Sequence, residues 1–147
     1  MSHNDASALA KSDFELLSAF RYQMRRFEHF SENAARAQGI TPLQYLLLLH
    51  VKGFPGRDWA SIGELAERLQ SQQHGVVALV SRCEAAQLVR RQPGKADRRS
   101  VEVHLLARGE ALLTHLAALH RAELQSLEGT FAVPVIAIPE EAPHARK

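Results

Sequence analysis

Basic side chains gather between Arg90 and Arg99, where the sequence holds five positive residues and one carboxylate. The positive residues are Arg90, Arg91, Lys95, Arg98 and Arg99, and the carboxylate is Asp97. A short segment with this excess of positive charge suits contact with the phosphates of a nucleic acid. The formal net charge of the whole chain is only +2, so the local distribution of charge, rather than its total, indicates a nucleic-acid partner.

The basic segment falls in a predicted β-hairpin. Residues 88–91 have the composition of a strand, and Pro93 and Gly94 begin a turn. Val101, Val103 and Leu105 then alternate with polar residues, which is typical of a half-buried return strand. The hairpin therefore carries much of its positive charge at its tip.

Two short predicted helices precede the hairpin. Ser61 and Glu64 form a capping box at the start of the first helix, whose apolar face runs to Leu69. After a break near Ser71, regularly spaced apolar residues mark a second helix that ends near Gln87. Two short helices joined by a tight turn are the helix-turn-helix arrangement, whose second helix has the right width for the major groove of DNA.

Another helix is expected upstream of this pair. Thr41 and Gln44 form a second capping box around Pro42, which suits the first helical position. Residues 53–56 break this helix, and Trp59 lies on a short extended piece before the next one. The region from about 41 to 105 thus has the elements of a DNA-binding lobe: three helices and a hairpin.

Long helical patterns flank this lobe on both sides. They cover residues of about 12–38 and 107–128, and each carries an apolar stripe at helical spacing. The stripe of the first helix includes Phe14, Leu17, Phe20, Met24, Phe27 and Ala34, and that of the second includes Leu112, Leu113, Leu116, Leu119 and Leu124. Residues 1–11 are small and polar and are expected to be a flexible N-terminus. Residues 129–147 form a separate tail, because three prolines forbid a continuous helix there.

Three short motifs, in this order and spacing, resemble the MarR-type regulators. Residues 79–91 look like that family's link between recognition helix and wing, residues 97–100 like its Asp-x-Arg-Ser wing motif, and residues 106–109 like the start of its dimerisation helix. The resemblance covers residues of about 14–127. It implies a mainly α winged helix-turn-helix domain, with a three-helix core, a β-hairpin wing and long N- and C-terminal dimerisation helices at 12–128.

The resemblance also implies a function and its residues. Such proteins are cytoplasmic homodimers that bind inverted repeats in double-stranded DNA, often as repressors released by a small aromatic or phenolic effector. Arg99 matches the arginine that enters the minor groove, and Asp97 the carboxylate that orients it, which two side chains on one strand face could do. Arg82 matches a basic residue of the recognition helix. The full predicted DNA-binding set is Ser71, Gln72, Gln73, His74, Ser81, Arg82, Arg90, Lys95, Asp97, Arg98 and Arg99.

The sequence departs from the family at two places. Gly75, Val77 and Ala78 stand where many relatives have Ser, Thr or Arg, so direct reading of bases would depend on the glutamines, His74 and Ser81. Specificity is then weaker, or depends on DNA shape. The tail lacks the final helix with which the family interlocks its dimer. Of Arg90 and Arg91, one is expected to face phosphate and the other to pair within the fold.

Weaker hypotheses concern an effector, metals and redox chemistry. His29, Phe30, His50 and Trp59 are candidates for an effector pocket between the long helices and the lobe. The eight histidines include no tight ligand pair, so neither a metal nor another cofactor is expected. Cys83 keeps step with Val76 and Leu79 and is expected in the core.

Composition excludes several other classes of protein. No apolar stretch is long enough to span a membrane, no secretion signal begins the chain, and the single cysteine fits a reducing compartment. No set of residues suggests catalysis, so an enzyme is not expected. Two alternatives to the DNA-binding regulator stay open: a winged-helix interaction module without sequence-specific DNA binding, and a metal- or redox-responsive sensor.

Overall fold

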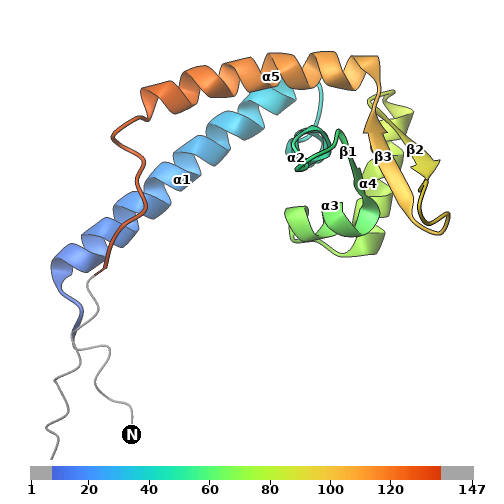
Figure 1. Cartoon of the computed structure of the whole chain (residues 1–147). Helices are drawn as coiled ribbons and strands as arrows, with labels where there is room; N and C mark the ends of the chain where they lie inside the picture. The colour runs from blue at the N-terminus through green and yellow to red at the C-terminus, as the bar shows by residue number, and fades with distance from the viewer. Residues whose placement is uncertain (1–7, 137–147) are drawn as a thin grey trace, which may run out of the picture.

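The computed structural model describes residues 8–136, and within them it has five helices and one three-stranded sheet (Figure 1). In chain order the elements are α1 (Lys11–Ala37), α2 (Pro42–Lys52), β1 (Trp59–Ser61), α3 (Ile62–Leu69), α4 (Gln73–Ala85), β2 (Val89–Pro93), β3 (Val101–Leu105) and α5 (Ala107–Ser126). This confirms the predicted fold class, a mainly α winged helix with long flanking helices. We refer to residues 41–105 as the lobe.

Capping boxes start two helices of the lobe, as the sequence predicts. The Thr41 hydroxyl accepts the N–H of Gln44, whose side chain accepts the N–H of Thr41 in return. Ser61 and Glu64 do the same at α3. Each box satisfies two backbone donors that a helix leaves without a partner at its start, and so fixes where the helix begins.

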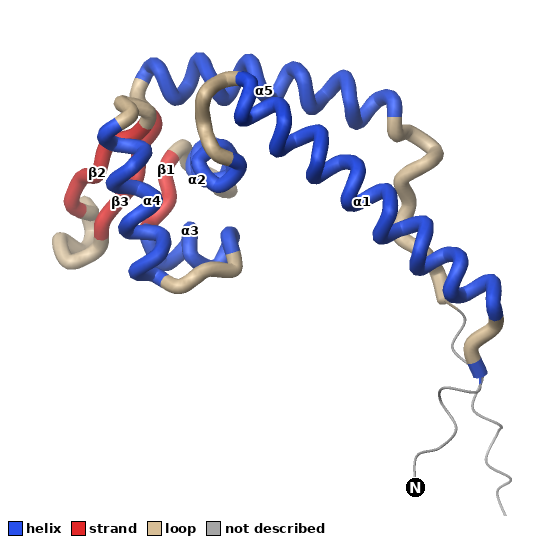
Figure 2. The backbone as a smooth tube through the Cα atoms, turned by 180° about the vertical axis from the view of Figure 1, so that it is seen from behind, coloured by secondary structure: helices blue, strands red, loops and turns tan. Residues whose placement is uncertain are grey.

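The sheet of the lobe places β3 between its two neighbours. Its strand order is β1-β3-β2 and both pairings are antiparallel. Ala60 lies opposite Val103 in one pairing, and Arg91 lies opposite the same residue in the other. The hairpin of β2 and β3 is the wing, and Trp59 belongs to β1 at the opposite edge of the sheet (Figure 2).

The core lies inside the lobe and under the first half of α5. Its largest fully buried side chains are Leu47, Leu48, Leu65, Leu88, Leu116, Val51, Val76, Val80, Val89, Val103 and Cys83. Cys83 is therefore a core residue, as its spacing predicts. Leu113 and Leu116 of α5 join this cluster, so α5 is part of the lobe's packing as well as a long helix beyond it.

A close backbone approach seats the start of α5. The Leu106 N–H donates to the Leu88 carbonyl at 2.9 Å, and the same carbonyl lies against Gly109. A Cβ atom at residue 109 would overlap the Leu88 carbonyl oxygen. Gly109 is thus required by contact, and a Lys52–Glu110 ion pair of 2.6 Å also links α5 to α2.

Beyond the lobe, α1 and α5 pack on each other, and the chain after α5 turns back along α1 (Figures 1 and 2). Phe131 contacts Phe20 with 5.8 Å between ring centroids. Residues 131–136 have no regular secondary structure, in agreement with the prediction that the helix does not continue there. The parts of the predicted terminal segments at 1–7 and 137–147 lie outside the described residues.

We predict that Gln87→Gly stabilises the protein. Gln87 follows α4 with φ of 61°, a left-handed conformation that favours glycine. The change should raise the free energy of unfolding by about 0.5–1 kcal/mol, measured by urea denaturation with an unchanged m-value. The matched control is Gln38→Gly, at an ordinary φ of −94°, which should lower stability. Equal effects of the two changes would contradict the conformational argument.

Candidate nucleic-acid interface

The exposed face of α4 is a continuous stripe along the helix. The exposed residues are Gln73, His74, Val77, Ala78, Ser81, Arg82 and Ala85, while Val76, Leu79, Val80 and Cys83 face the core. This separation at helical spacing puts three turns of side chains on one outward surface. Sequence reasoning found the polar members of the stripe, and the structure adds Val77, which is 41% exposed.

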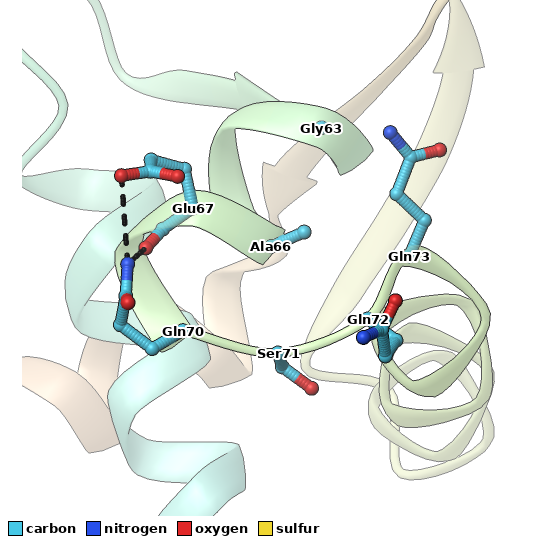
Figure 3. Close-up of a pocket in the computed structure, with 7 residues that line it drawn as sticks. All are labelled: Gly63, Ala66, Glu67, Gln70, Ser71, Gln72 and Gln73. Atoms are coloured by element: carbon cyan, nitrogen blue, oxygen red, sulfur yellow. Dashed lines mark hydrogen bonds between the residues drawn. The ribbon is translucent and has the colours of Figure 1, made fainter.

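Ser71, Gln72 and Gln73 line a polar hollow of about 620 Å³ where α3 turns into α4 (Figure 3). Its other side is formed by α3, where the Gln70 amide donates to the Glu67 carbonyl at 2.8 Å. Gln72 precedes α4 as its N-cap residue without a side-chain capping bond. The predicted residues at the start of α4 therefore lie together on one exposed surface, with their side chains turned outward.

Ser81 and Arg91 are held by contacts inside the lobe. The Arg91 Nε donates to the Glu84 carboxylate at 2.5 Å, and its terminal nitrogen donates to the Ser81 hydroxyl. This guanidinium lowers the pKa of Glu84. The Ser81 hydroxyl in turn donates to the Val77 carbonyl at 3.0 Å. Arg91 is thus the arginine that pairs within the fold, and it couples α4 to β2, whereas Arg90 is exposed.

A buried carboxylate organises the wing. Glu102 of β3 is 4% exposed and accepts from His104 Nε2 at 3.0 Å, from the Gln92 amide at 3.2 Å and from the Lys95 N–H at 3.2 Å. The hydrogen bond from His104 is the main cause that lowers the pKa of Glu102. Three donors on one carboxylate fix the base of the wing loop. Sequence reasoning missed Glu102 because it appeared as one of the polar residues of an alternating strand.

The wing loop gives Asp97 a role that differs from the predicted one. Asp97 and Arg99 lie in the turn between β2 and β3, so the expectation of two side chains on one strand face is wrong. The Asp97 carboxylate accepts the backbone N–H of Arg99 at 2.9 Å, and the Asp97 carbonyl accepts from Ser100. Asp97 therefore shapes the backbone that carries Arg99, since a short acidic side chain favours such turns.

Four cations of the wing are exposed: Arg90, Lys95, Arg98 and Arg99. Within residues 8–136 none of them forms an ion pair, and Arg82 on α4 likewise has no acidic partner there. Positive groups that are not neutralised by neighbours are the ones that release counterions when they meet phosphate. The wing and α4 together thus present an electropositive surface.

The four predicted pocket residues do not gather in one place. His29 is exposed on α1, Phe30 packs edge-on against His120, and Trp59 stacks on His104 in the sheet. His50 lies in α2, where burial and the nearby Arg68 lower its pKa. None of the four lines the apolar groove that the structure does contain.

That groove, of about 610 Å³, lies between α1, α2 and α5. Its lining is Phe27, Tyr45, Leu49, Ala117, His120, Arg121, Leu124, Gln125, Leu127, Glu128 and Phe131. His120 is buried and stacks on Tyr45 with 4.8 Å between centroids. Its Nδ1 donates to the Leu116 carbonyl at 2.7 Å, which leaves Nε2 to meet the Ser31 hydroxyl at 2.8 Å. Burial raises the pKa of Tyr45.

In the described residues, the state of Cys83 and the placement of the possible metal ligands do not favour redox or metal chemistry. Cys83 is fully buried, and loss of solvent raises the pKa of its thiol to about 11, which disfavours the reactive thiolate. Over residues 8–136 no three His, Cys, Asp or Glu side chains converge on a possible metal position. Within the same part of the chain, no helix is both long and apolar enough to cross a membrane.

Comparison with known proteins agrees with this geometry. Residues 38–100 match the model of the MarR family. Among solved structures, the MarR family transcriptional regulator AbsC from Streptomyces coelicolor has a TM-score of 0.71 at 22% identity, over 86% of this chain and 84% of that one. No curated protein sequence matches significantly.

Two further structural neighbours are associated with DNA. A mutant of S. aureus MepR bound to an oligodeoxyribonucleotide has a TM-score of 0.62 at 19% identity, over 77% of this chain and 81% of that one. Bordetella bronchiseptica BpsR, whose DNA binding is regulated by 6-hydroxynicotinic acid, has a TM-score of 0.59 at 22% identity, over 74% and 76%.

The lobe, with its wing and its exposed fourth helix, defines a winged helix-turn-helix protein. Residues 38–100 thus match the MarR family model, and the described chain has the winged helix fold of MarR family structures, in agreement with the resemblance noted in the sequence.

We predict that Glu102 makes the wing sensitive to acid. Because folding lowers the pKa of Glu102 from its ordinary value of 4.5, its contribution is complete above that value and is lost as the pH falls through the folded pKa. Glu102→Gln puts an amide NH2 among three donors, so it should destabilise the protein at pH 7. The difference from the parent should shrink towards pH 3, measured by urea denaturation at each pH. A constant difference across this range would contradict the role of the carboxylate.

Proposed function

We propose that the chain is a DNA-binding transcription regulator that acts as a homodimer on an inverted-repeat operator. The observation that carries this proposal is the exposed stripe of α4 next to a wing with four exposed cations, within a MarR-type fold. An α-helix fits the major groove, and a hairpin tip beside it reaches the adjacent backbone or minor groove. One lobe therefore offers two probes for one duplex.

Phosphate contacts and base contacts are divided between these two probes. The residues at the start of α4, from Ser71 to His74, offer donors to bases or phosphates. Arg82 lies about two turns further along the same exposed stripe. Arg99, on the backbone that Asp97 shapes, enters the minor groove, where negative potential attracts a guanidinium. Arg90, Lys95 and Arg98 contact phosphates, which supply affinity and register but not sequence choice.

A second copy of the chain covers the apolar face of the long helices. Large apolar residues remain exposed there, namely Leu9, Phe14, Leu16, Leu17 and Tyr22 at α1, Leu119 and Leu124 on α5, and Phe131, Val133 and Val135 after it. An exposed apolar surface of this size marks an interaction site. A two-fold dimer would set two α4 helices roughly 34 Å apart, one turn of DNA.

The groove between α1, α2 and α5 is the proposed effector site. It is largely apolar, has aromatic walls from Phe27 and Tyr45, and has the polar groups of Arg121 and Gln125 at hand, a combination that suits a small aromatic or phenolic molecule. Binding there would favour one arrangement of long helices and lobe over another and so release DNA, as in a repressor. A shift in the protein's melting temperature with 6-hydroxynicotinic acid and related compounds would measure binding of such molecules to the protein.

The experiment that tests the proposal is a salt-dependent gel shift of the purified protein with its own upstream DNA and with random DNA of equal length. Preference for the upstream fragment at moderate salt supports the regulator. Equal and weak binding to both fragments supports instead the interaction module, which the apolar Val77 and Ala78 on α4 favour.

We predict that Arg99→Ala weakens DNA binding and lowers the slope of log K against log salt by about one unit. The reason is the loss of one phosphate-proximal cation that has no acidic partner among the described residues. Fluorescence anisotropy at several salt concentrations measures both quantities. The control is Arg25→Ala on α1, outside the lobe, which should keep the parent's slope. An unchanged slope for Arg99→Ala would remove the wing from the interface.

We predict that Leu17→Glu prevents dimer formation. Leu17 is 38% exposed on α1, and a charge in an apolar interface has to be desolvated without a partner. Sedimentation equilibrium should show a dimer for the parent and a monomer for the variant. Ala96→Glu, which adds the same charge to the wing loop, should leave the dimer intact. A dimeric Leu17→Glu protein would place the subunit contact elsewhere.

A further inference from the structure

We infer that α4 reads A·T base pairs in the major groove, with Gln73 on an adenine edge and Val77 and Ala78 against thymine methyl groups. The inference rests on the proposed function, since it requires α4 in the groove. It goes further by assigning the chemical identity of the bases that this particular helix prefers.

The first observation is the order of side chains along the exposed stripe of α4. Gln73 and His74 occupy its first turn, Val77 and Ala78 the second, and Arg82 the third. Val77 leaves 41% of an apolar side chain exposed. On a helix that enters DNA, such a surface gains most where it meets another apolar group, and the thymine methyl is the apolar group of the major groove.

The second observation is the absence of a cation from the first two turns of α4. Guanine is most often bound through its O6 and N7 acceptors by arginine or lysine, and between Gln73 and Ala78 the helix has neither. A glutamine amide offers a donor and an acceptor side by side, which matches N7 and N6 of adenine. A ring N–H of His74 can donate to the N7 of either purine, so His74 does not decide between them.

The third observation is that Gln73 is exposed at the start of α4 and that its amide is not engaged by the fold. Its amide nitrogen lies 3.6 Å from where a Cβ of Gly63 would be, so the side chain extends across the start of α3 (Figure 3). Among residues 8–136 the Gln73 side chain has no hydrogen-bond partner. Its amide therefore keeps both its donors and its acceptor for a base.

Ser81 does not contact a base, because its hydroxyl is engaged within the protein. Its hydroxyl donates to the Val77 carbonyl and accepts from Arg91, so it positions Arg91 rather than a base. Arg82 is then the one basic residue of the α4 stripe in the described chain. A bidentate contact to guanine O6 and N7 from this helix must therefore fall on the Arg82 side of the half-site, away from the part that Gln73 and Val77 face.

The test starts with selection of bound duplexes from a random pool by the purified full-length chain. The expected sites have at least two successive A·T pairs at the centre of each half-site. Binding to the selected site is then measured after single replacements of thymine by deoxyuridine, which removes only the methyl group. Each methyl contacted should cost about fourfold in affinity. Replacement of adenine by 7-deazaadenine, which removes N7, should weaken binding at the position that Gln73 faces.

Variants assign each effect to a residue. Val77→Ala should abolish the penalty for deoxyuridine at its position, and Gln73→Ala should abolish the penalty for 7-deazaadenine. Gln38→Ala, an exposed glutamine at the end of α1, should keep both penalties. Since Val77 and Gln73 are exposed, loss of folding is not expected, and circular dichroism of each variant checks this.

Three results would overturn the inference, and they are separable from failure of the proposed function. A·T reading is contradicted, with DNA binding intact, by any of three outcomes. They are selected half-sites with G·C at the centre, binding that deoxyuridine does not weaken, and penalties that persist in both variants. Sequence-independent binding contradicts operator recognition, so the proposed function and the inference would both fall. A protein that retains no duplex even at low salt contradicts the proposed function itself, and the inference falls with it.

Discussion

The contact between Gly109 and the Leu88 carbonyl is the constraint on which the arrangement of the molecule depends. It lets the first turn of α5 lie directly on the turn that joins α4 to the wing. A side chain at residue 109 would push the helix away, because the carbonyl is backbone and cannot move without displacing β2. The direction of α5, and with it any dimer built on α5, is therefore set by the same turn that ends α4.

His120 makes a separate contact between α5 and the lobe, beyond the core residues Leu113 and Leu116. It lies eleven residues beyond Gly109, which corresponds to roughly 16 Å along a helix. Its ring is packed on Tyr45 of α2 and bonded to Ser31 of α1, so one side chain touches all three elements that surround the apolar groove. Because α5 contacts the lobe at Gly109, at Leu113 and Leu116 and again at His120, the lobe and the long helix behave as one body while these contacts hold. A molecule in the groove lies next to His120, which makes the His120 contact the one it can change.

The sequence was sufficient for those elements whose signals are local. Thr41 and Ser61 begin helices through residues three positions away, and the alternation of Val101, Val103 and Leu105 marks β3 without knowledge of its partners. The core position of Cys83 followed from helical spacing. The resemblance to MarR-type proteins then supplied the assembly of these elements, which periodicity alone does not give.

What the sequence could not provide are contacts between distant residues and the conformation of loops. Ser31 and His120 are bonded across 89 positions, and nothing in the pattern of either helix distinguishes them. Trp59 lies in β1, which does not reach the groove, and His50 lies in α2 but does not line the groove as Tyr45 and Leu49 do. Asp97 was placed on a strand because alternation does not locate the end of a strand to a residue. The strand β3 begins four residues later, at Val101, and the Asp97 carboxylate accepts a backbone N–H instead of a guanidinium.

These side-chain contacts also alter the charge that the wing presents to DNA. The sequence has five positive residues between Arg90 and Arg99, but Arg91 is held by Glu84 and Ser81 within the lobe. The Asp97 carboxylate remains in the wing loop as a negative charge, and its hydrogen bond is with a backbone N–H rather than with a cation. Affinity from counterion release depends on the cations that reach phosphate rather than on the formal count. The wing therefore contributes a moderate electrostatic attraction, and the discrimination between sites has to come from the shape of the minor groove at Arg99 and from the exposed stripe of α4.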